Sequence, residues 1–157
     1  MDQTIPAGRM QLTVHTAKQY AAMARLEASI ELEPTLRHLV KLRASQINGC
    51  AFCIDMHWKD ARAAGESDER LYLLDAWRES PVYDDRERAA LDLCEAMTLI
   101  TDGHVSDEVW ERASQAFADE DLAQLVFAIT AINAWNRLTI TARAEPGHYR
   151  PPAREAA

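Results

Sequence analysis

The stretch LVKLRASQINGCAFCIDMHWKDARAAGES (residues 39–67) predicts parts of two consecutive helices and contains two of the chain's three cysteines. Pro34, just upstream, suits the first turn of a helix, and apolar residues then recur at helical spacing. The Asn-Gly dipeptide at 48–49 is typical of a helix end. A second helix is therefore expected to begin at Cys50 and to run to Gly65.

Helical spacing of apolar residues extends through most of the remaining chain, and only the short segment QLTV resembles a strand. In the amphipathic segment that follows Asp84, Cys94 and Ile100 are expected to face the core. Further helices are expected over residues 16–30, 67–80, 84–103, 106–117 and 119–143, the last as an apolar central helix. The sequence thus predicts an all-α fold of about six or seven helices, preceded by an extended N-terminal arm.

The composition indicates one globular domain, residues 1–157, with a core at about 16–142, an arm at 1–15 and a tail at 143–157. Lys and Arg total 17 against 25 for Asp and Glu, and the net charge of −8 argues against nucleic acid or an anionic membrane as a partner. Neither a signal peptide nor an apolar run of roughly 20 residues is recognisable. A cytoplasmic location is expected, with no bound cofactor.

Residues 50–57 have the spacing Cys-x-x-Cys-x-x-x-His and are the candidate reactive site of the chain. On a helix, Cys53 and His57 lie on one face at positions i and i+4, and Cys50 lies one turn before Cys53. A thiolate near a helix N-terminus is stabilised by unpaired N–H groups and by the helix dipole. His57 would then act as a general base or, when protonated, would stabilise the thiolate.

Three interpretations of these residues compete. A zinc site would use Cys50, Cys53 and His57 together with a fourth ligand, for which His38, His15 and Cys94 are available. None of those three belongs to a paired ligand motif, which weakens the metal interpretation. Alternatively, the cysteines simply pack in a helical core. The helical register of the histidine and the Asn-Gly entry favour a redox-active dithiol.

The stretch that includes SQINGCAFCIDMH resembles the core of the AhpD-like alkylhydroperoxidases, within the carboxymuconolactone decarboxylase superfamily. The resemblance continues through RLYLLDAWRESPVYDDRERAALDLCEAMT and INAWNRL, and it spans about residues 16–142. It implies an AhpD-like helical bundle that assembles as a homotrimer or homohexamer. It also implies a peroxidase activity that depends on the two thiols.

In such enzymes the second cysteine of the motif, here Cys53, attacks a peroxide, and the first, here Cys50, resolves the sulfenic acid into a disulfide. His57 takes the place of the family's proton-accepting histidine. A partner dithiol protein of the lipoyl or thioredoxin type must then reduce the disulfide. These roles are what the resemblance implies for this chain.

The chain departs from the family pattern twelve residues before Cys50, where the family's relay glutamate is replaced by His38. A histidine with an ordinary pKa near 6.5 can pass protons to His57 but cannot supply a permanent negative charge. Phe52, between the cysteines, cannot relay protons and is expected to pack at an interface or to shield the sulfurs. Both departures concern the chemistry of the site and leave the expected fold unchanged.

Two other functions remain open. One is a carboxymuconolactone decarboxylase-like enzyme on the same fold, although its relatives use acid–base residues without a dithiol. The other is a non-enzymatic protein in which the dithiol senses redox state.

Outside the motif, Cys94 is expected to pack in the core. Asn133 and Arg137, at i and i+4 in an apolar helix, are expected to clamp a helix end or to cross an interface.

Overall fold

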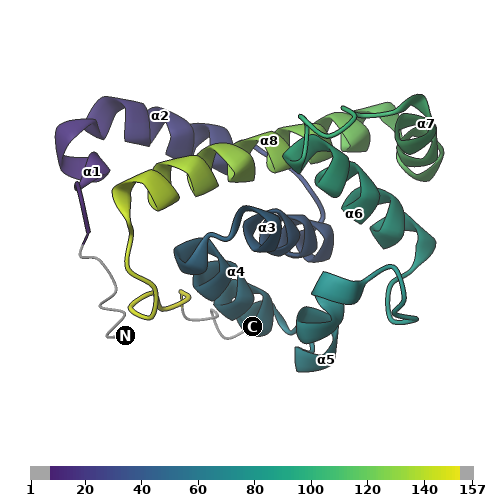
Figure 1. Ribbon diagram of the computed structural model, residues 1–157, viewed down its shortest axis with the longest axis horizontal. Helices are drawn as coiled ribbons and strands as arrows, with labels where there is room; N and C mark the ends of the chain where they lie inside the picture. The colour runs from purple at the N-terminus through teal and green to yellow at the C-terminus, as the bar shows by residue number, and fades with distance from the viewer. Residues whose placement is uncertain (1–7, 153–157) are drawn as a thin grey trace.

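The computed structural model describes residues 8–152, and every regular element in that range is helical (Figure 1). The predicted all-α fold is therefore confirmed. The elements are α1 (Leu12–His15), α2 (Ala17–Ala28), α3 (Pro34–Asn48), α4 (Ala51–Ala64), α5 (Asp68–Tyr72), the 3₁₀ helix η1 (Leu73–Ala76), α6 (Asp85–Thr98), α7 (Asp107–Ala116) and α8 (Asp119–Ala142). The described residues form eight α-helices, and the extended arm expected over residues 1–15 is wrong where α1 forms. Residues 1–7 of that arm lie outside the described residues.

The ends of α3 and α4 follow from local chemistry. The Glu33 carboxylate caps α3 by accepting from the backbone N–H groups of Thr35 and Leu36, each at 2.9 Å. Gly49 ends α3 in the left-handed conformation, with φ of 67°, which a glycine adopts without steric cost. Cys50 follows directly as the N-cap of α4, so the predicted boundary between the two helices is confirmed.

The core forms where α3 packs against α4, α6 and α8. Figure 1 shows α8 crossing the length of the molecule above α3 and α4, with α1 and α2 at one end and α7 at the other. The prediction that α8 is a central helix is thus confirmed for the side of α8 that packs on the core. Its fully buried residues include Leu125, Ala128, Ile129 and Ile132. Phe127 and Ile140, on the same helix, are 55% and 43% exposed.

Two predictions about buried faces and helix length are wrong. Ile100 is 42% exposed because α6 ends at Thr98, before the apolar stripe reaches it. The helix expected over 67–80 stops at Ala76, because the chain turns there. The guanidinium of Arg88 donates to the carbonyls of Trp77, Arg78, Ser80 and Tyr83, and these bonds satisfy backbone groups that the turn leaves without helical partners.

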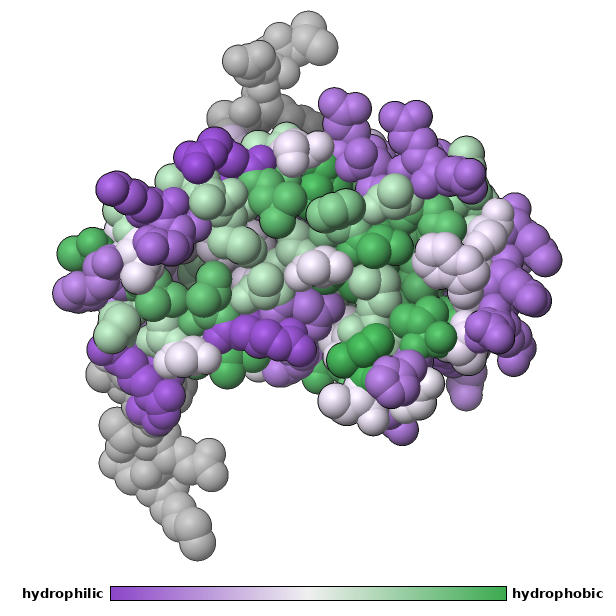
Figure 2. Space-filling model, turned by 90° about the horizontal axis from the view of Figure 1, so that it is seen from above, coloured by the Kyte–Doolittle hydropathy of each residue, from purple (hydrophilic) through white to green (hydrophobic). Residues whose placement is uncertain are grey.

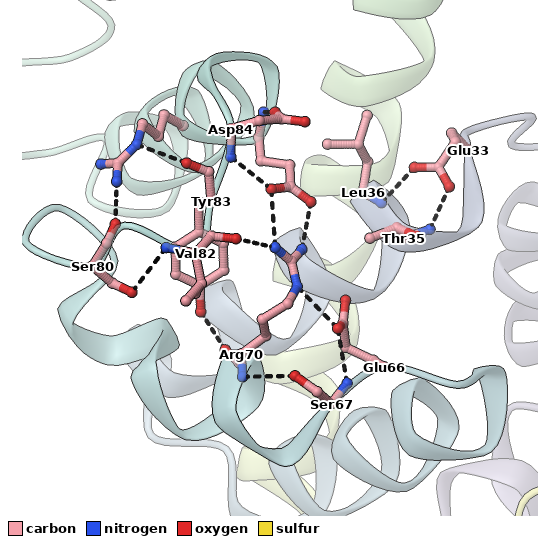
Figure 3. Close-up of polar contacts among 12 residues, drawn as sticks. Glu33, Thr35, Leu36, Glu66, Ser67, Arg70, Ser80, Val82, Tyr83 and Asp84 are labelled. Atoms are coloured by element: carbon pink, nitrogen blue, oxygen red, sulfur yellow. Dashed lines mark hydrogen bonds and ion pairs between the residues drawn. The ribbon is translucent and has the colours of Figure 1, made fainter.

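A polar network centred on Arg70 joins α5 to α6 (Figure 3). The Arg70 guanidinium donates to the carboxylates of Glu66 and Glu87 and to the carbonyl of Val82. The Tyr83 hydroxyl donates to the Arg70 carbonyl. Glu87 also accepts from the Asp84 backbone N–H at 2.9 Å as part of a capping box, so the network fixes the start of α6.

Apolar side chains gather on the face formed by α1, α2 and α8 (Figure 2). No residue of α2, all of which is described, is fully buried within the single chain. The large apolar side chains exposed here include Val14 and Tyr20 in addition to Phe127 and Ile140 of α8. No helix among residues 8–152 combines the length and apolarity that crossing a membrane requires.

Candidate active site

The two cysteines of the motif meet at the beginning of α4, as the sequence predicts. The Cys50 Sγ accepts a hydrogen bond from the backbone N–H of Cys53 at 3.4 Å, which makes its side chain the N-cap of the helix. Both cysteines are free thiols and are each only 1% exposed. Cys50 and Cys53 are called the dithiol below.

Thr139, from the last turns of α8, completes the surroundings of the dithiol. Its Oγ1 lies 3.0 Å from the Cys50 Sγ and 3.2 Å from the Cys53 Sγ. Asn136, three residues earlier, also acts on both sulfurs through hydrogen bonding. Sequence reasoning missed both residues. The available signal was the recurrence of polar residues at 133, 136 and 139 in an otherwise apolar helix, at a spacing that places them on one face.

These contacts make the two thiols very different in acidity. Hydrogen bonds lower the pKa of Cys50 to about 6, first from the Cys53 thiol and then from the Thr139 hydroxyl and the Cys53 backbone N–H, against the opposing effect of burial. The pKa of Cys53 is raised by that same hydrogen bond and by burial. The dithiol therefore holds one negative charge near neutral pH as a pair, and the hydrogen bond from the Cys53 backbone N–H favours the Cys50 sulfur as its position.

His57 lies one turn after Cys53 and is buried, with 6% of its surface exposed. Burial lowers its pKa to about 3, and the charge of Lys41 and that of His38, when it is protonated, act in the same direction. The imidazole is therefore neutral, which favours a base over an imidazolium that stabilises the thiolate. Its Nδ1 is 3.9 Å from the Asp60 Oδ2, and its Nε2 has no hydrogen-bond partner among residues 8–152.

His38 lies on α3 and is half-buried. Burial lowers its pKa, with Asp60 acting in the opposite direction, so the ordinary value assumed from the sequence is wrong. His38, when protonated, disfavours a charged His57. His38 also lines a small cavity of about 200 Å³ between the start of α3 and the end of α4.

A buried amide network holds α3 and α8 together beside the dithiol. The Asn48 side chain donates to the Oδ1 atoms of Asn133 and Asn136, at 3.0 and 2.9 Å. Asn136 in turn donates to the Ser45 hydroxyl at 3.1 Å. Arg137 donates to the carbonyl and to the side-chain oxygen of Asn133, at 2.8 and 3.0 Å. Of the two residues that were expected to clamp a helix end or to cross an interface, Asn133 contacts the last residue of α3, and Arg137 bonds to Asn133 within α8.

A larger cavity of about 730 Å³ lies next to the dithiol, on the side of α1 and α2. Phe52, which lies between the two cysteines in the sequence, and Thr139, which contacts both sulfurs, belong to its wall. The other large side chains of the wall are of two kinds. The apolar ones are Met10, Leu12, Val14, Tyr20, Trp135 and Leu138, and the polar or charged ones are Arg9, Gln11, His15, Arg143 and Glu145. A small molecule with both polar and apolar groups could therefore approach the dithiol from this side.

The remaining candidates from the sequence lie apart from the dithiol or in the core. Cys94 is fully buried and donates to the Val40 carbonyl at 3.3 Å, which confirms its role in packing. His15 ends α1 and is exposed on the wall of the larger cavity. Within the described part of the chain, no group of three or more His, Cys, Asp or Glu side chains could hold a metal ion.

Comparison with known proteins adds a family relationship to this geometry. Residues 15–96 match the model of the carboxymuconolactone decarboxylase family. The chain is 45% identical to the uncharacterised protein YdfG of Bacillus subtilis over 118 residues, which cover 75% of this chain and 80% of YdfG.

Two solved structures are similar in fold. A protein of unknown function from Agrobacterium tumefaciens, proposed to be the antioxidant defence protein AhpD, matches with a TM-score of 0.88 and 38% identity, covering 91% of this chain and 100% of that one. A peroxidase-related protein with an AhpD core from Ralstonia eutropha matches with a TM-score of 0.73 and 19% identity, covering 87% of this chain and 74% of that one. At that lower identity the likeness concerns the fold alone.

Proposed function

Since this chain belongs to the carboxymuconolactone decarboxylase family and has an AhpD-like fold, we propose that it is a thiol-dependent peroxidase with a redox-active Cys-x-x-Cys pair. At the start of α4, both sulfurs contact the Thr139 hydroxyl of α8, and this observation supports the proposal most directly. This contact favours one thiolate and one thiol, which is the protonation state that a dithiol peroxidase needs. Two cysteines that only pack in the core would not require a thiolate.

In the proposed cycle the attacking thiolate bonds to one peroxide oxygen as the O–O bond breaks. The leaving oxygen takes a proton and departs as an alcohol or as water, and the cysteine becomes a sulfenic acid. The second thiol then bonds to that sulfur and releases water, which leaves a disulfide. Two electrons thus pass from the dithiol to the peroxide. A reductant dithiol returns them by exchange and itself becomes a disulfide.

Cys53 is the proposed attacking residue and Cys50 the resolving residue. The negative charge that the dithiol holds is compatible with these roles, because His57 can remove the remaining proton of Cys53 before attack. His57, on the same helical face as Cys53, is the proposed base, and neutral His38 is the proposed next member of the proton relay. Both imidazoles are uncharged near neutral pH and are therefore able to accept a proton.

The proposed reductant is a lipoyl-bearing or thioredoxin-type protein, because the disulfide must be opened by a second dithiol. The proposed assembly is a homotrimer or homohexamer. The apolar side chains exposed over α1, α2 and α8 support an assembly, because a second copy would remove them from water (Figure 2).

A peroxidase assay tests the proposal. The reduced protein is mixed with cumene hydroperoxide and supplied in turn with a lipoyl protein or with thioredoxin, each with its own reductase. We expect turnover with one of the two reductants, none for Cys53→Ser, and near wild-type turnover for Cys94→Ala, which removes the thiol packed in the core. Unchanged turnover in Cys53→Ser would refute the assignment. A disulfide that forms stoichiometrically but is opened by neither reductant would instead indicate redox sensing.

A further inference from the structure

Asp60 is a carboxylate that faces the proposed base from one turn further along α4. Its Oδ2 is 3.9 Å from the His57 Nδ1, and its Oδ1 accepts a hydrogen bond of 2.6 Å from the Tyr149 hydroxyl. The Asp60 side chain is 23% exposed, whereas that of His57 is only 8% exposed. The carboxylate thus keeps contact with water while it is directed at a buried ring.

The C-terminal segment, residues 143–152, is held along α4 by three polar contacts. The Gly147 backbone N–H donates to the Asp55 carboxylate at 3.0 Å. The Lys59 ammonium donates to the Tyr149 carbonyl at 3.3 Å. The Tyr149 hydroxyl makes the third contact, with Asp60, and its pKa is raised to about 12 by burial and by the Asp60 carboxylate. Tyr149 therefore remains a donor throughout the neutral range.

Two other groups act on His57, and both come from α3. Lys41 is positive and disfavours a charged imidazole, and His38 does the same when it is protonated. Lys41 is itself paired with Glu27 of α2. Proton transfer from a thiol to His57 is unfavourable in this position, because the positive imidazolium that forms would be buried and needs a nearby negative charge to stabilise it. The Asp60 carboxylate is placed where it can provide that charge.

We propose that Asp60 is a positioning residue for His57 and that Tyr149 holds Asp60 in place. The carboxylate favours the tautomer with its proton on Nδ1, which leaves the buried Nε2 as the basic nitrogen. When Nε2 takes the proton of Cys53, the gap of 3.9 Å closes to a charge-assisted hydrogen bond. The proton moves from sulfur to nitrogen, and the carboxylate stays ionised. The role in thiol activation rests on the proposed function, whereas the choice of tautomer does not.

The test uses the full-length protein and the variant Asp60→Asn. We expect the ¹⁵N spectrum of His57 to shift from the Nδ1–H tautomer toward a mixture with the Nε2–H form. In a Cys50→Ser background, which isolates the Cys53 thiol, alkylation by iodoacetamide at pH 7 should slow at least about tenfold. This loss is a fraction of the roughly 100- to 10,000-fold that a positioned general base contributes. Peroxide oxidation of Cys53 should slow by a similar factor.

Three further variants make the result specific. Asp60→Glu should restore part of the rate, because it keeps the carboxylate. Tyr149→Phe should cause a smaller loss in the same direction, and it remains informative if Asp60→Asn fails to fold. Asp68→Asn removes an exposed carboxylate that pairs with Arg62 at the surface, and it should change nothing.

An unchanged His57 tautomer and an unchanged alkylation rate in Asp60→Asn would overturn the inference, even if the wild type is a peroxidase. Equal losses in Asp60→Asn and Asp68→Asn would overturn it as well, because they would indicate a general effect of surface charge. Conversely, a wild type that consumes no peroxide would refute the proposed function. The tautomer and alkylation measurements would still decide the role of Asp60.

Discussion

Thr139 and Cys50 stand 89 residues apart in the sequence, and the Thr139 Oγ1 lies 3.0 Å from the Cys50 Sγ. The same oxygen lies 3.2 Å from the Cys53 Sγ. A hydroxyl has one proton to donate and two lone pairs to accept with. Its one proton is shared between the Cys50 sulfur and the carbonyls of Trp135 and Asn136, which the oxygen also reaches at 2.9 and 3.2 Å, and its lone pairs can accept from the thiol of Cys53. One side chain of α8 thus helps to make the two sulfurs unequal.

Replacing Thr139 by valine should reduce the reactivity of Cys50. Valine keeps the shape of threonine but cannot donate, and a hydrogen bond to a charged group contributes about 1.5–3 kcal/mol. This loss would move the pKa of Cys50 from about 6 to above neutrality, so alkylation of Cys50 at pH 7 should slow by about two- to fifteenfold. Thr139→Ser keeps the hydroxyl and should react like the wild type. An unchanged rate in Thr139→Val would show that the hydroxyl is not needed.

Separate serine variants of the dithiol should reveal the order of events. With one equivalent of peroxide, Cys50→Ser should accumulate a sulfenic acid on Cys53, because the resolving thiol is missing. Cys53→Ser should accumulate none. Trapping with dimedone followed by mass spectrometry measures both. If the sulfenic acid forms only in Cys53→Ser, Cys50 is the attacking residue, which its lower pKa would then explain.

His57 should make the folded state less stable as the pH falls below 6.5. Its pKa is about 3 when folded and near 6.5 when unfolded, so the unfolded chain binds more protons between these values. The contribution of His57 to stability is complete above pH 6.5, and about 2 kcal/mol of it is lost at pH 5. Urea unfolding at pH 7 and pH 5 measures the difference. His57→Gln should remove most of this pH dependence, and an equally steep dependence in that variant would contradict the expectation.

The Arg70 network should contribute to stability without affecting the dithiol directly. Arg70 and Glu87 are mostly buried, with side chains 21% and 12% exposed. Arg70→Leu leaves two carboxylates without their partner and should lower the free energy of unfolding by about 3 kcal/mol. The matched control is Arg62→Leu, at an ion pair that is exposed on both sides, where about 0–1 kcal/mol is expected. Equal losses in the two variants would show that the network adds nothing.

The sequence predicts the local features of the site well. The boundary at Gly49 and Cys50 is where the sequence places it, and the helices expected from residues 67 and 106 begin there, with Ser67 and Ser106 as their N-caps. Each depends on residues within four positions of one another, and such short-range chemistry is visible in a single sequence. The helical register of the cysteines and His57 belongs to the same class.

The contacts that complete the site were not predictable in this way. Thr139 and Tyr149 reach the start and the middle of α4 across 86 to 89 residues of sequence. Only the packing of α8 and the course of the C-terminal segment bring them there. Asp60 is different, because it lies three residues after His57 and was within reach of helical reasoning. Its significance depends on Tyr149, which directs its carboxylate.

The position of Cys50 as the N-cap of α4 has a consequence for redox potential. In the reduced protein its sulfur accepts from the Cys53 N–H, so the thiolate stabilises the helix and the helix stabilises the thiolate. A disulfide carries no negative charge and loses this mutual stabilisation. Any free energy that favours the reduced form raises the reduction potential, by about 30 mV for each 1.4 kcal/mol. The disulfide of this protein should therefore be a comparatively strong oxidant that a partner dithiol readily opens.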